Sequence, residues 1–396
     1  MRIALIHTPL IHSTGGERQI LQLAIELSKK GHKVEIFTNY VDKQNCFPEL
    51  LSKVKVNTIP LNPMSFLRII ISLGFRVGMG GTLGRLMILS IAKAIPHDEF
   101  DIINCHNPST NWAAWLAKKR LKIPIVWMCN EPPFWHFLSQ ERNKKTFIID
   151  FLLFNVFDEY TVKFVDEIVV LSKKFQNIVK KVYCRNSTIV RSGVDINFFE
   201  NGNGEKIRKD LGLENSFILL QVGTASSYKI DFSSVLALSY LHKKYEQLRL
   251  IFIGYRVKEF FGPEIYRLGL DKKVFFFTNI DDKKLVDFYA SCDVFLFPAN
   301  QSWGLVVVEA MAASKTVIVS EEAGVSEIIQ NGVNGIVVEH GQPKKIAYHV
   351  EKLINNPQLR RDIGKNAHEF VKENFSWEKY ANEMLEIFEN TLQKRK

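Results

Sequence analysis

The amino-acid sequence predicts an α/β protein of two domains, each a doubly wound parallel sheet covered by helices. Three observations lead to this prediction. The chain has 396 residues, more than one hydrophobic core usually supports. Apolar strand-like runs alternate with helical runs in both halves, which is the pattern of parallel sheets. A stretch rich in Gly and Asn, residues 191–204, lies between the halves and predicts a hinge.

The first half begins with a short apolar strand at residues 2–7. A polar loop at 8–16 ends in two glycines, and a helix follows at 17–30, with Ile20, Leu21, Ala24 and Leu27 on one face. Gly31 ends that helix. Later strands of the same sheet are expected at residues 33–38, 101–105, 124–128 and 167–171.

The second half repeats this rhythm. Its strands are expected at residues 217–222, 248–254, 274–278, 294–297, 316–320 and 335–338. The predicted domains are therefore residues 1–192 and residues 193–374.

The composition is that of an ordinary soluble globular protein, with 46% hydrophobic and 24% charged residues. The five cysteines are scattered and form no CxxC pair, which argues against a disulfide framework or a structural zinc site and favours a reducing, cytoplasmic compartment. No secretory signal is recognised at the start, and charged residues interrupt every long apolar run, so no membrane span is expected.

The net charge of +10 is unevenly divided. Residues 1–200 carry +9 and residues 201–396 carry +1, counting Lys and Arg against Asp and Glu. A basic first domain fits three anionic partners: nucleic acid, a membrane face or a phosphorylated acceptor. It also fits a surface that serves only solubility.

Two segments of the first half are apolar or aromatic with basic residues between them. They are residues 66–95 and residues 134–164. Such segments can lie in a membrane interface, or they can be helices that face the core. The charge division favours the membrane surface.

The first loop, HSTGGER, joins a strand to a helix through Gly15 and Gly16. Glycines let the backbone approach a phosphate, and the helix starting near Glu17 adds its N-terminal field and free amides. The pattern is neither a GxGxxG fingerprint nor a GxxxxGK loop, which disfavours a dinucleotide enzyme or an ATPase. A tight turn with no ligand remains the alternative.

The second half has a similar stretch, LLQVGTASSYK. Its strand delivers Gly223 and then Lys229, a point charge suited to a diphosphate, although loop lysines are mostly only solvated.

The stretch NQSWGLVVVEAMAA is more specific. Trp303, Gly304 and Leu305 lead into a helix expected at residues 305–313, whose first amides can hold an anion. Glu309 lies one turn into this helix, where its carboxylate can accept two hydrogen bonds from a vicinal diol such as ribose. A core position would reject this charge unless it were paired.

Several motifs together resemble glycosyltransferase family 4, the retaining, group 1 type enzymes of GT-B architecture. The motifs are GGERQILQLAIELSKKGHKVEIFT, DIINCHN, RSGVDINFF, QVGTASSYK, WGLVVVEAMAASKTVIVS with GVSEIIQNGVNGIVV, and FSWEKYANEMLEIF. The resemblance implies two Rossmann-like domains facing a central cleft, an acceptor-binding first domain and a nucleotide-sugar-binding second domain. It also implies a C-terminal helix, residues 375–396, that crosses back to the first domain.

The resemblance implies roles for individual residues. Glu309 would hold the ribose, Lys229 and the amides near residues 303–305 the diphosphate, and Gly15 and Gly16 the donor phosphate, next to Glu17. His106 would border the reacting centre. The donor would be a nucleotide sugar used as a substrate, with no metal and no cofactor.

Two positions depart from the family pattern. The family commonly has Glu eight residues before the ribose Glu, where this chain has Gln301, which supplies no negative charge to a developing oxocarbenium ion. It often has Arg directly after the glycine of the VG strand end, where this chain has Thr224. Gln301 is still expected to contact the donor sugar, and Gly223 and Thr224 the diphosphate.

Three functional hypotheses follow. The first is a hexosyltransferase, with GDP-mannose as the first donor and a UDP-hexose as the second, acting on a lipid-linked or saccharide acceptor at the cytoplasmic membrane face. The second is a non-catalytic relative that binds nucleotide sugars or glycolipids, which Gln301 and Thr224 motivate. The third, nucleic-acid binding, rests only on the basic charge and lacks a recognition motif.

Overall fold

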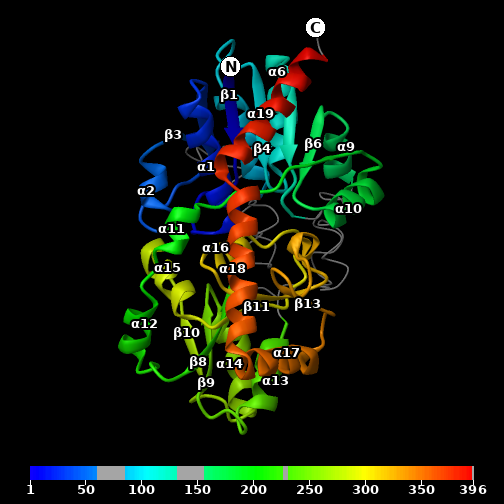
Figure 1. Cartoon of the computed structure of the whole chain (residues 1–396). Coiled ribbons are helices and arrows are strands. Elements are labelled where there is room, and N and C mark those ends of the chain that lie inside the picture. The colour runs from blue at the N-terminus through cyan, green and yellow to red at the C-terminus, as the bar shows by residue number, and fades with distance from the viewer. Residues whose placement is uncertain (60–84, 132–155, 226–230, 395–396) are drawn as a thin grey trace. The chain divides into compact units, whose positions relative to one another are not determined.

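The computed structural model describes residues 1–59, 85–131, 156–225 and 231–394 (Figure 1). The chain folds as two units. The first unit is Met1–Arg191 together with Trp377–Lys396, and the second is Ser192–Ser376. The boundaries expected from the sequence followed residues 192 and 374. Each unit is built on one parallel sheet, which confirms the predicted fold class.

The first sheet has seven parallel strands in the order β3-β2-β1-β4-β5-β6-β7. The strands are β1 (Arg2–Ile6), β2 (Lys33–Thr38), β3 (Lys55–Thr58), β4 (Ile102–His106), β5 (Ile125–Met128), β6 (Glu167–Val170) and β7 (Thr188–Ile189). The order reverses between β1 and β4, so the chain leaves these neighbouring strands in opposite directions. Ligands of doubly wound sheets bind beside the carboxyl ends of the strands at such a point.

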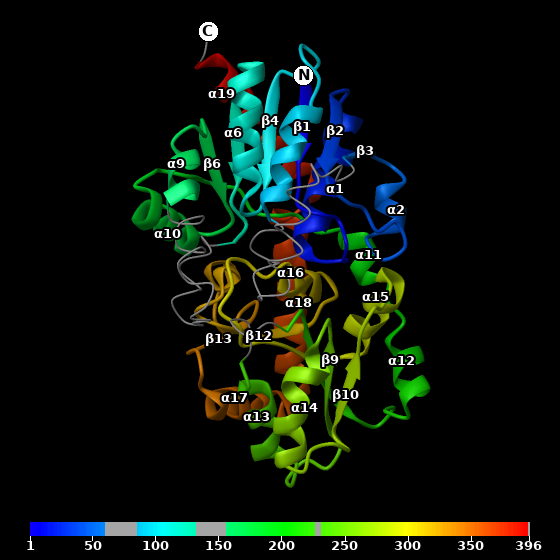
Figure 2. The same cartoon turned by 180° about the vertical axis from the view of Figure 1, so that it is seen from behind.

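Helices cover both faces of this sheet. The helical segments are α1 (Gly15–Lys29), α2 (Pro48–Leu51), η1 (Arg85–Ser90), α5 (Ile91–Ala94), α6 (Thr110–Leu121), α9 (Glu159–Val162), α10 (Lys173–Tyr183) and α19 (Trp377–Gln393). Figure 1 shows α1 and α19 side by side on one face, and Figure 2 shows α6 on the other.

The C-terminal helix α19 is held to the first unit by its apolar face. Tyr380, Ala381, Met384 and Phe388 recur at helical spacing and are all buried. The predicted return of the C-terminal helix to the first domain is therefore present in the structure.

The second sheet has six parallel strands in the order β10-β9-β8-β11-β12-β13. They are β8 (Phe217–Val222), β9 (Leu248–Ile253), β10 (Val274–Phe277), β11 (Val294–Phe297), β12 (Thr316–Ser320) and β13 (Ile336–Val338). The order reverses between β8 and β11, which gives this unit its own ligand-binding edge.

The helices of the second unit again lie on both faces of the sheet (Figures 1 and 2). They are α11 (Ile196–Glu200), α12 (Gly204–Leu211), α13 (Ser233–Leu241), α14 (Val257–Arg267), α15 (Asp282–Ser291), α16 (Leu305–Ala312), η3 (Gly324–Ile328), α17 (Pro343–Asn355) and α18 (Pro357–Asn374). Helices α16 and α18 pack on β12, whereas α13 packs on β9.

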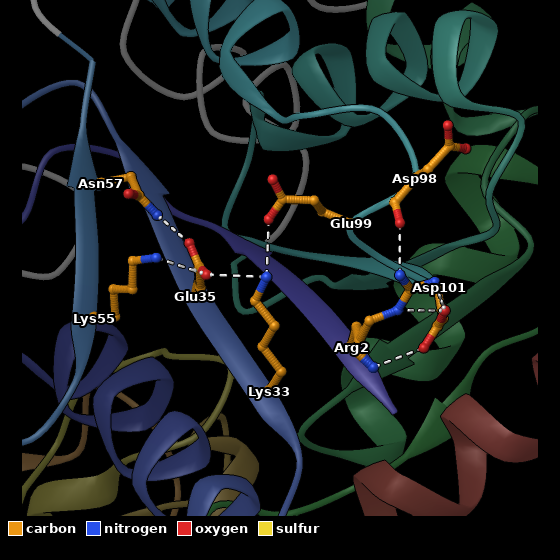
Figure 3. Close-up of polar contacts among 8 residues, drawn as sticks. All are labelled: Arg2, Lys33, Glu35, Lys55, Asn57, Asp98, Glu99 and Asp101. Carbon is orange, nitrogen blue, oxygen red and sulfur yellow. Dashed lines mark hydrogen bonds and ion pairs between the residues drawn. The ribbon is translucent and has the colours of Figure 1, made fainter.

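A cluster of polar side chains lies near the amino ends of β1, β2 and β3 and in the segment just before β4 (Figure 3). Arg2 forms an ion pair of 2.6 Å with Asp101, and Lys55 forms one of 2.9 Å with Glu35. Glu35 also accepts a 2.8 Å hydrogen bond from Asn57. The cluster lies at the edge opposite the carboxyl ends of the strands, away from the edge where ligands of such sheets bind. We therefore interpret its ion pairs and hydrogen bonds as contacts that stabilise the sheet.

One feature of the sequence prediction needs correction: the short edge strands β3 and β7 were not expected. The boundary between the two units, after Arg191, falls within residues 191–204, where the hinge was predicted. This stretch also contains α11, whose first turn is capped by the Asp195 carboxylate through a 3.1 Å bond from the Phe198 amide.

The two amphipathic segments lie largely outside the described residues. The described end of the first, residues 85–95, has Ile88, Ile91 and Ile95 buried in the core of the first unit. This part therefore faces the core and not a membrane surface. At the end of the second, Phe157 packs edge-on against Trp112 and Trp115.

Candidate functional site

The glycine pair of the first loop lies within a helix. Gly15 and Gly16 are the first two residues of α1, which therefore begins two residues before the predicted start at Glu17. The first amides of an α-helix have no intrahelical partner and point away from the helix start. The structure thus provides the expected amide edge after β1.

Glu17 is held at this helix start. The Thr14 hydroxyl donates a short hydrogen bond to its carboxylate, and burial raises the pKa of Glu17 above its ordinary value. Gly16 packs against a side chain of another strand end, since a Cβ atom here would lie 3.4 Å from Nδ2 of Asn107.

His106 is the last residue of β4 and is completely buried. Its Nε2 lies 2.7 Å from Oδ1 of Asn104. Burial, and after it the neighbouring His7, lower the pKa of His106 well below its ordinary value, so the ring is neutral at pH 7. The two rings flank the point where the strand order reverses, with centroids 6.4 Å apart.

A hydrogen-bonded network that the sequence did not reveal lies beside His106 and includes its ring neighbour His7. Asn107 donates to Nε2 of His7 at 2.8 Å, and Asn130 donates to Asn107 at 3.0 Å and to Gln19 at 2.7 Å. His7, Asn107 and Asn130 each follow shortly after a buried strand. That position is the signal that could have indicated them.

In the second unit, Gly223 follows β8 in a backbone conformation with φ of 152°. A Cβ atom at Gly254, which follows the neighbouring strand β9, would lie 2.0 Å from the Gly223 carbonyl oxygen. The two backbone segments can therefore approach this closely only because residue 254 is glycine. The amide of Gly223 donates to Ile253 at 2.9 Å, which leaves Thr224 as the next residue able to offer an amide to a ligand. Lys229 lies outside the described residues.

The loop after β11 turns into α16 at Gly304. This residue has φ of 144°, and a Cβ atom would lie 2.9 Å from Cε1 of Phe297. Glycine is therefore required by both backbone and space. Trp303 is buried beside Phe375, with ring centroids 6.1 Å apart, and Leu305 begins the helix as predicted.

Glu309 lies one turn into α16 and is only 3% exposed. Its Oε2 accepts a 2.8 Å hydrogen bond from the hydroxyl of Tyr289, a fully buried residue of α15. Gln301 is half-buried in the loop before α16, where its backbone carbonyl oxygen accepts a 2.8 Å bond from the Gly324 amide of η3. The buried carboxylate thus has the partner that its position demands.

The expected site residues therefore form two groups. Gly15, Gly16, Glu17 and His106 lie at the carboxyl edge of the first sheet, after β1 and at the end of β4. Gly223, Thr224, Gln301, Trp303, Gly304, Leu305 and Glu309 lie after β8 and β11, neighbours in the second sheet. Each group is at the point where its strand order reverses.

Among the described residues, no group of three His, Cys, Asp or Glu side chains is arranged to hold a metal ion. No helix within the same residues has the length and apolar character needed to cross a membrane.

Two family models match the chain. The model described as Glycosyltransferase Family 4 matches residues 13–198, and the model described as Glycosyl transferases group 1 matches residues 203–370. The two matches together span most of the sequence and follow the division into two units.

Curated relatives carry the name glycosyltransferase. A D-inositol 3-phosphate glycosyltransferase of Corynebacterium efficiens is 25% identical, over 98% of this chain and 95% of that protein. The alpha-1,3/1,6-mannosyltransferase ALG2 of Homo sapiens is 25% identical, over 93% of this chain and 91% of that protein. An uncharacterized glycosyltransferase of Methanocaldococcus jannaschii is 28% identical, but the match spans only 64% of its length.

Among solved structures, Anabaena Alr3699/HepE in complex with UDP-glucose has a TM-score of 0.78 at 20% identity. The similarity covers 98% of this chain and 100% of that chain. It shows that the two share the GT-B fold.

Proposed function

Because the chain belongs to the group 1 glycosyltransferases of the family 4 type, we propose that it transfers a hexose from a nucleotide-diphospho-sugar to a hydroxyl acceptor, with retention of configuration. The observation that carries the proposal is the edge of the second sheet. There Gly304, whose positive φ and close neighbours disfavour a side chain, directly precedes α16, and a buried carboxylate, Glu309, lies one turn into the helix.

The proposed donor contacts follow from this edge. The first amides of α16, near Trp303, Gly304 and Leu305, stabilise the diphosphate together with Lys229, because helix N-termini and cations favour anions. Glu309 accepts hydrogen bonds from the two ribose hydroxyls. The Tyr289 hydroxyl fixes one carboxylate oxygen, which orients the group before the nucleotide binds.

The proposed reaction needs no metal or cofactor. The bond between the sugar and the diphosphate breaks as Lys229 and the helix amides stabilise the leaving group, and a leaving phosphate oxygen takes the proton from the attacking hydroxyl. Gln301 contacts the sugar, His106 borders the reacting centre as a neutral ring, and Gly15 and Gly16 contact the donor phosphate. Positioning and electrostatics supply the catalysis.

GDP-mannose is the first proposed donor and a UDP-hexose the second. The GGER start resembles mannosyl-transferring members of the family, and one relative is named a mannosyltransferase. The UDP-glucose complex of the Anabaena protein supports including UDP-sugars in the test.

The donor test is direct. Calorimetric titration with GDP-mannose, GDP-glucose, UDP-glucose and UDP-galactose should show saturable binding for one base. Product anomers determined by NMR should retain the donor configuration. If no nucleotide sugar binds, the proposal fails.

We also propose a lipid-linked or saccharide acceptor handled at the cytoplasmic membrane face. The support is the charge of +9 in residues 1–200. The chain should co-sediment with vesicles containing phosphatidylglycerol at low salt and be released at high salt. Equal sedimentation with neutral vesicles would contradict an electrostatic contact.

A second candidate is a binding-only relative, favoured by Gln301 and Thr224. It predicts donor binding without transfer or slow hydrolysis, and no activity gained in Gln301→Glu. Any turnover by the natural chain excludes it.

A further inference from the structure

The side chain of His340 lies across the carboxyl edge of the second sheet. His340 comes two residues after β13, the strand at one end of the strand order. Its Nδ1 lies 3.1 Å from the carbonyl oxygen of Pro298, which directly follows β11, and 3.3 Å from Oγ of Ser320, the last residue of β12. The same nitrogen lies 3.4 Å from Oδ2 of Asp231, just before α13. One ring nitrogen thus meets groups from three other segments of this edge.

The polarity of this ring nitrogen follows from its closest partner. The carbonyl oxygen of Pro298 can only accept a hydrogen bond, so Nδ1 of His340 carries a hydrogen and donates it. The Ser320 oxygen accepts the Glu322 amide at 3.1 Å, and the Ser320 side chain is completely buried beside the ring. His340 therefore turns the positive end of an N–H bond toward the Pro298 carbonyl and the Asp231 carboxylate.

Asp231 holds its carboxylate where water has little access. Its side chain is 8% exposed, and its Oδ1 accepts a 2.6 Å hydrogen bond from the Ser233 amide at the start of α13. A carboxylate in such a place costs free energy unless donors face its oxygens. Ser233 serves Oδ1, and the N–H of His340 faces Oδ2.

The place of this carboxylate matters for an anionic ligand. Asp231 belongs to the connection from β8 to α13, and β8 is one of the two strands between which the order of the second sheet reverses. The proposed donor has its diphosphate at this reversal, next to the first amides of α16. A carboxylate there repels a diphosphate unless nearby positive groups offset its charge. The N–H of His340 is such a group.

The bond to Pro298 acts on the other side of the reversal. Pro298 begins the segment 298–304, which connects β11 to α16 and carries Gln301. The backbone carbonyl of Gln301 accepts a 2.8 Å bond from the Gly324 amide, which fixes the middle of this segment. His340 fixes its beginning.

We propose that His340 is a positioning residue of the donor-binding edge. Through one N–H group it offsets the carboxylate of Asp231 and holds the start of the segment that carries Gln301, so that the edge accepts the diphosphate of a nucleotide sugar. It acts through Asp231 and Pro298 and not by touching the donor. The inference rests on the proposed function, because it explains how residues of this chain prepare the edge for that donor.

Two amide substitutions separate the two nitrogens of the ring. The amide nitrogen of asparagine can take the place of Nδ1, whereas the longer glutamine side chain puts its amide nitrogen near the place of Nε2. We expect His340→Leu to lower the affinity for GDP or UDP, measured by calorimetry, about threefold to tenfold, because a hydrogen bond and a donor facing a buried carboxylate are lost. His340→Asn should keep the parent affinity, and His340→Gln should behave like His340→Leu.

Two results of this series overturn the inference. The first is parent affinity in His340→Leu. The second is rescue by His340→Gln and not by His340→Asn, which would show that the outer nitrogen of the ring is the one that matters. The His340 side chain is 40% exposed, so all three variants should fold, and urea unfolding checks this.

A second substitution tests the charge. In the background of His340→Leu, Asp231→Asn removes the charge that the histidine no longer offsets. The affinity for GDP or UDP should then rise toward that of the parent chain. An affinity that does not rise overturns the inference.

A spectroscopic signature and a matched control complete the test. The whole chain is labelled with ¹⁵N-histidine, the His340 signals are assigned with His340→Asn, and Nδ1 should carry a hydrogen in the free protein. A bare Nδ1 overturns the inference. His349→Leu is the control, since the His349 ring lies in α17, packs edge-on against Tyr348 and should leave nucleotide affinity unchanged when replaced. Equal losses in His349→Leu and His340→Leu also overturn the inference.

The outcome for His340 is separable from that for the proposed function. If the natural chain binds neither a nucleotide diphosphate nor a nucleotide sugar, the proposed function fails. If it binds them and His340→Leu binds them equally well, only the positioning role fails.

Discussion

The hydroxyl of Tyr289 donates a 2.8 Å hydrogen bond to the carboxylate of Glu309, and both side chains are almost completely buried. The bond joins α15 to α16. It means that a charge placed at the ligand edge is oriented by a residue from a different helix.

Removing this donor tests the relationship. Tyr289→Phe should lower the free energy of unfolding by about 1–3 kcal/mol, because the bond is to a carboxylate and a buried acceptor loses a donor. Nucleotide binding should weaken as well. Tyr380→Phe is the matched control, since the buried hydroxyl of Tyr380 has no partner among the described residues and its loss should be neutral or stabilising. Urea unfolding and calorimetric titration measure both effects, and equal behaviour of the two variants would contradict the assignment.

Gly304→Ala should disturb the start of α16. The added methyl group would lie 2.9 Å from Cε1 of Phe297 and 3.0 Å from Cγ1 of Val325, closer than van der Waals contact. The φ of 144° is also unfavourable for alanine. We expect a loss of about 1–3 kcal/mol in stability and a clear loss of nucleotide affinity.

The control for Gly304 is Gly262→Ala in α14, where the nearest side-chain atom is 4.0 Å from the new Cβ. There the gain in helix propensity is opposed by Pro263, because a residue before proline disfavours the helical conformation, so the stability should change by less than about 1 kcal/mol and nucleotide binding should stay unchanged. Unchanged nucleotide binding by Gly304→Ala would show that the backbone at this position does not shape the ligand edge.

We expect the buried His7 to lower the free energy of unfolding in acid. Burial lowers the pKa of His7 from 6.5 to about 4, so the unfolded chain binds more protons between these values. The stability that the neutral His7 ring gives the folded state is fully present above about pH 6.5. It is lost as the pH falls from 6.5 to about 4, which lowers the free energy of unfolding by about 3 kcal/mol. Unfolding measured from pH 7 to pH 4 should show a shallower decline for His7→Gln. His97→Gln, at an exposed position, should keep the parent slope. A slope unchanged in His7→Gln would contradict the prediction.

The polar cluster of Figure 3 should respond according to burial. Arg2→Ala removes an ion pair between side chains that are 46% and 31% exposed, and should cost less than about 1 kcal/mol. Glu35→Gln weakens contacts of a side chain that is only 7% exposed and should cost about 1–3 kcal/mol. Urea unfolding at low and high salt measures both, and a larger loss for Arg2→Ala would be the contrary result.

The sequence predicts well those elements whose apolar pattern is unbroken. Four strands, β2, β8, β11 and β12, begin and end at the predicted residues, because each is a buried run ended by polar or turn residues. The edge strands β3 and β7 lack such a pattern, since each has neighbours on one side only and is partly exposed. The sequence therefore gives no apolar signal for them.

The site shows the same contrast. Glu309 could be singled out because a carboxylate in an apolar run needs a reason, and Gly304 because a helix starts after it. Its partner Tyr289 could not, since a tyrosine in a helix is an ordinary core residue until its hydroxyl is seen to reach α16. The network of His7, Asn107 and Asn130 includes a bond between residues one hundred positions apart, His7 and Asn107, which the order of the strands brings together.

The bridge between Val194 and Ser376 has a practical consequence for dissecting the molecule. The Val194 amide donates to the Phe375 carbonyl at 3.2 Å, so the second unit enters and leaves at neighbouring points. It is a single uninterrupted stretch of chain inserted into the first, and it can be excised as one gene fragment with its two ends already adjacent. The first unit, by contrast, consists of two stretches of chain, so producing it alone with α19 requires a short engineered linker from Arg191 to Trp377.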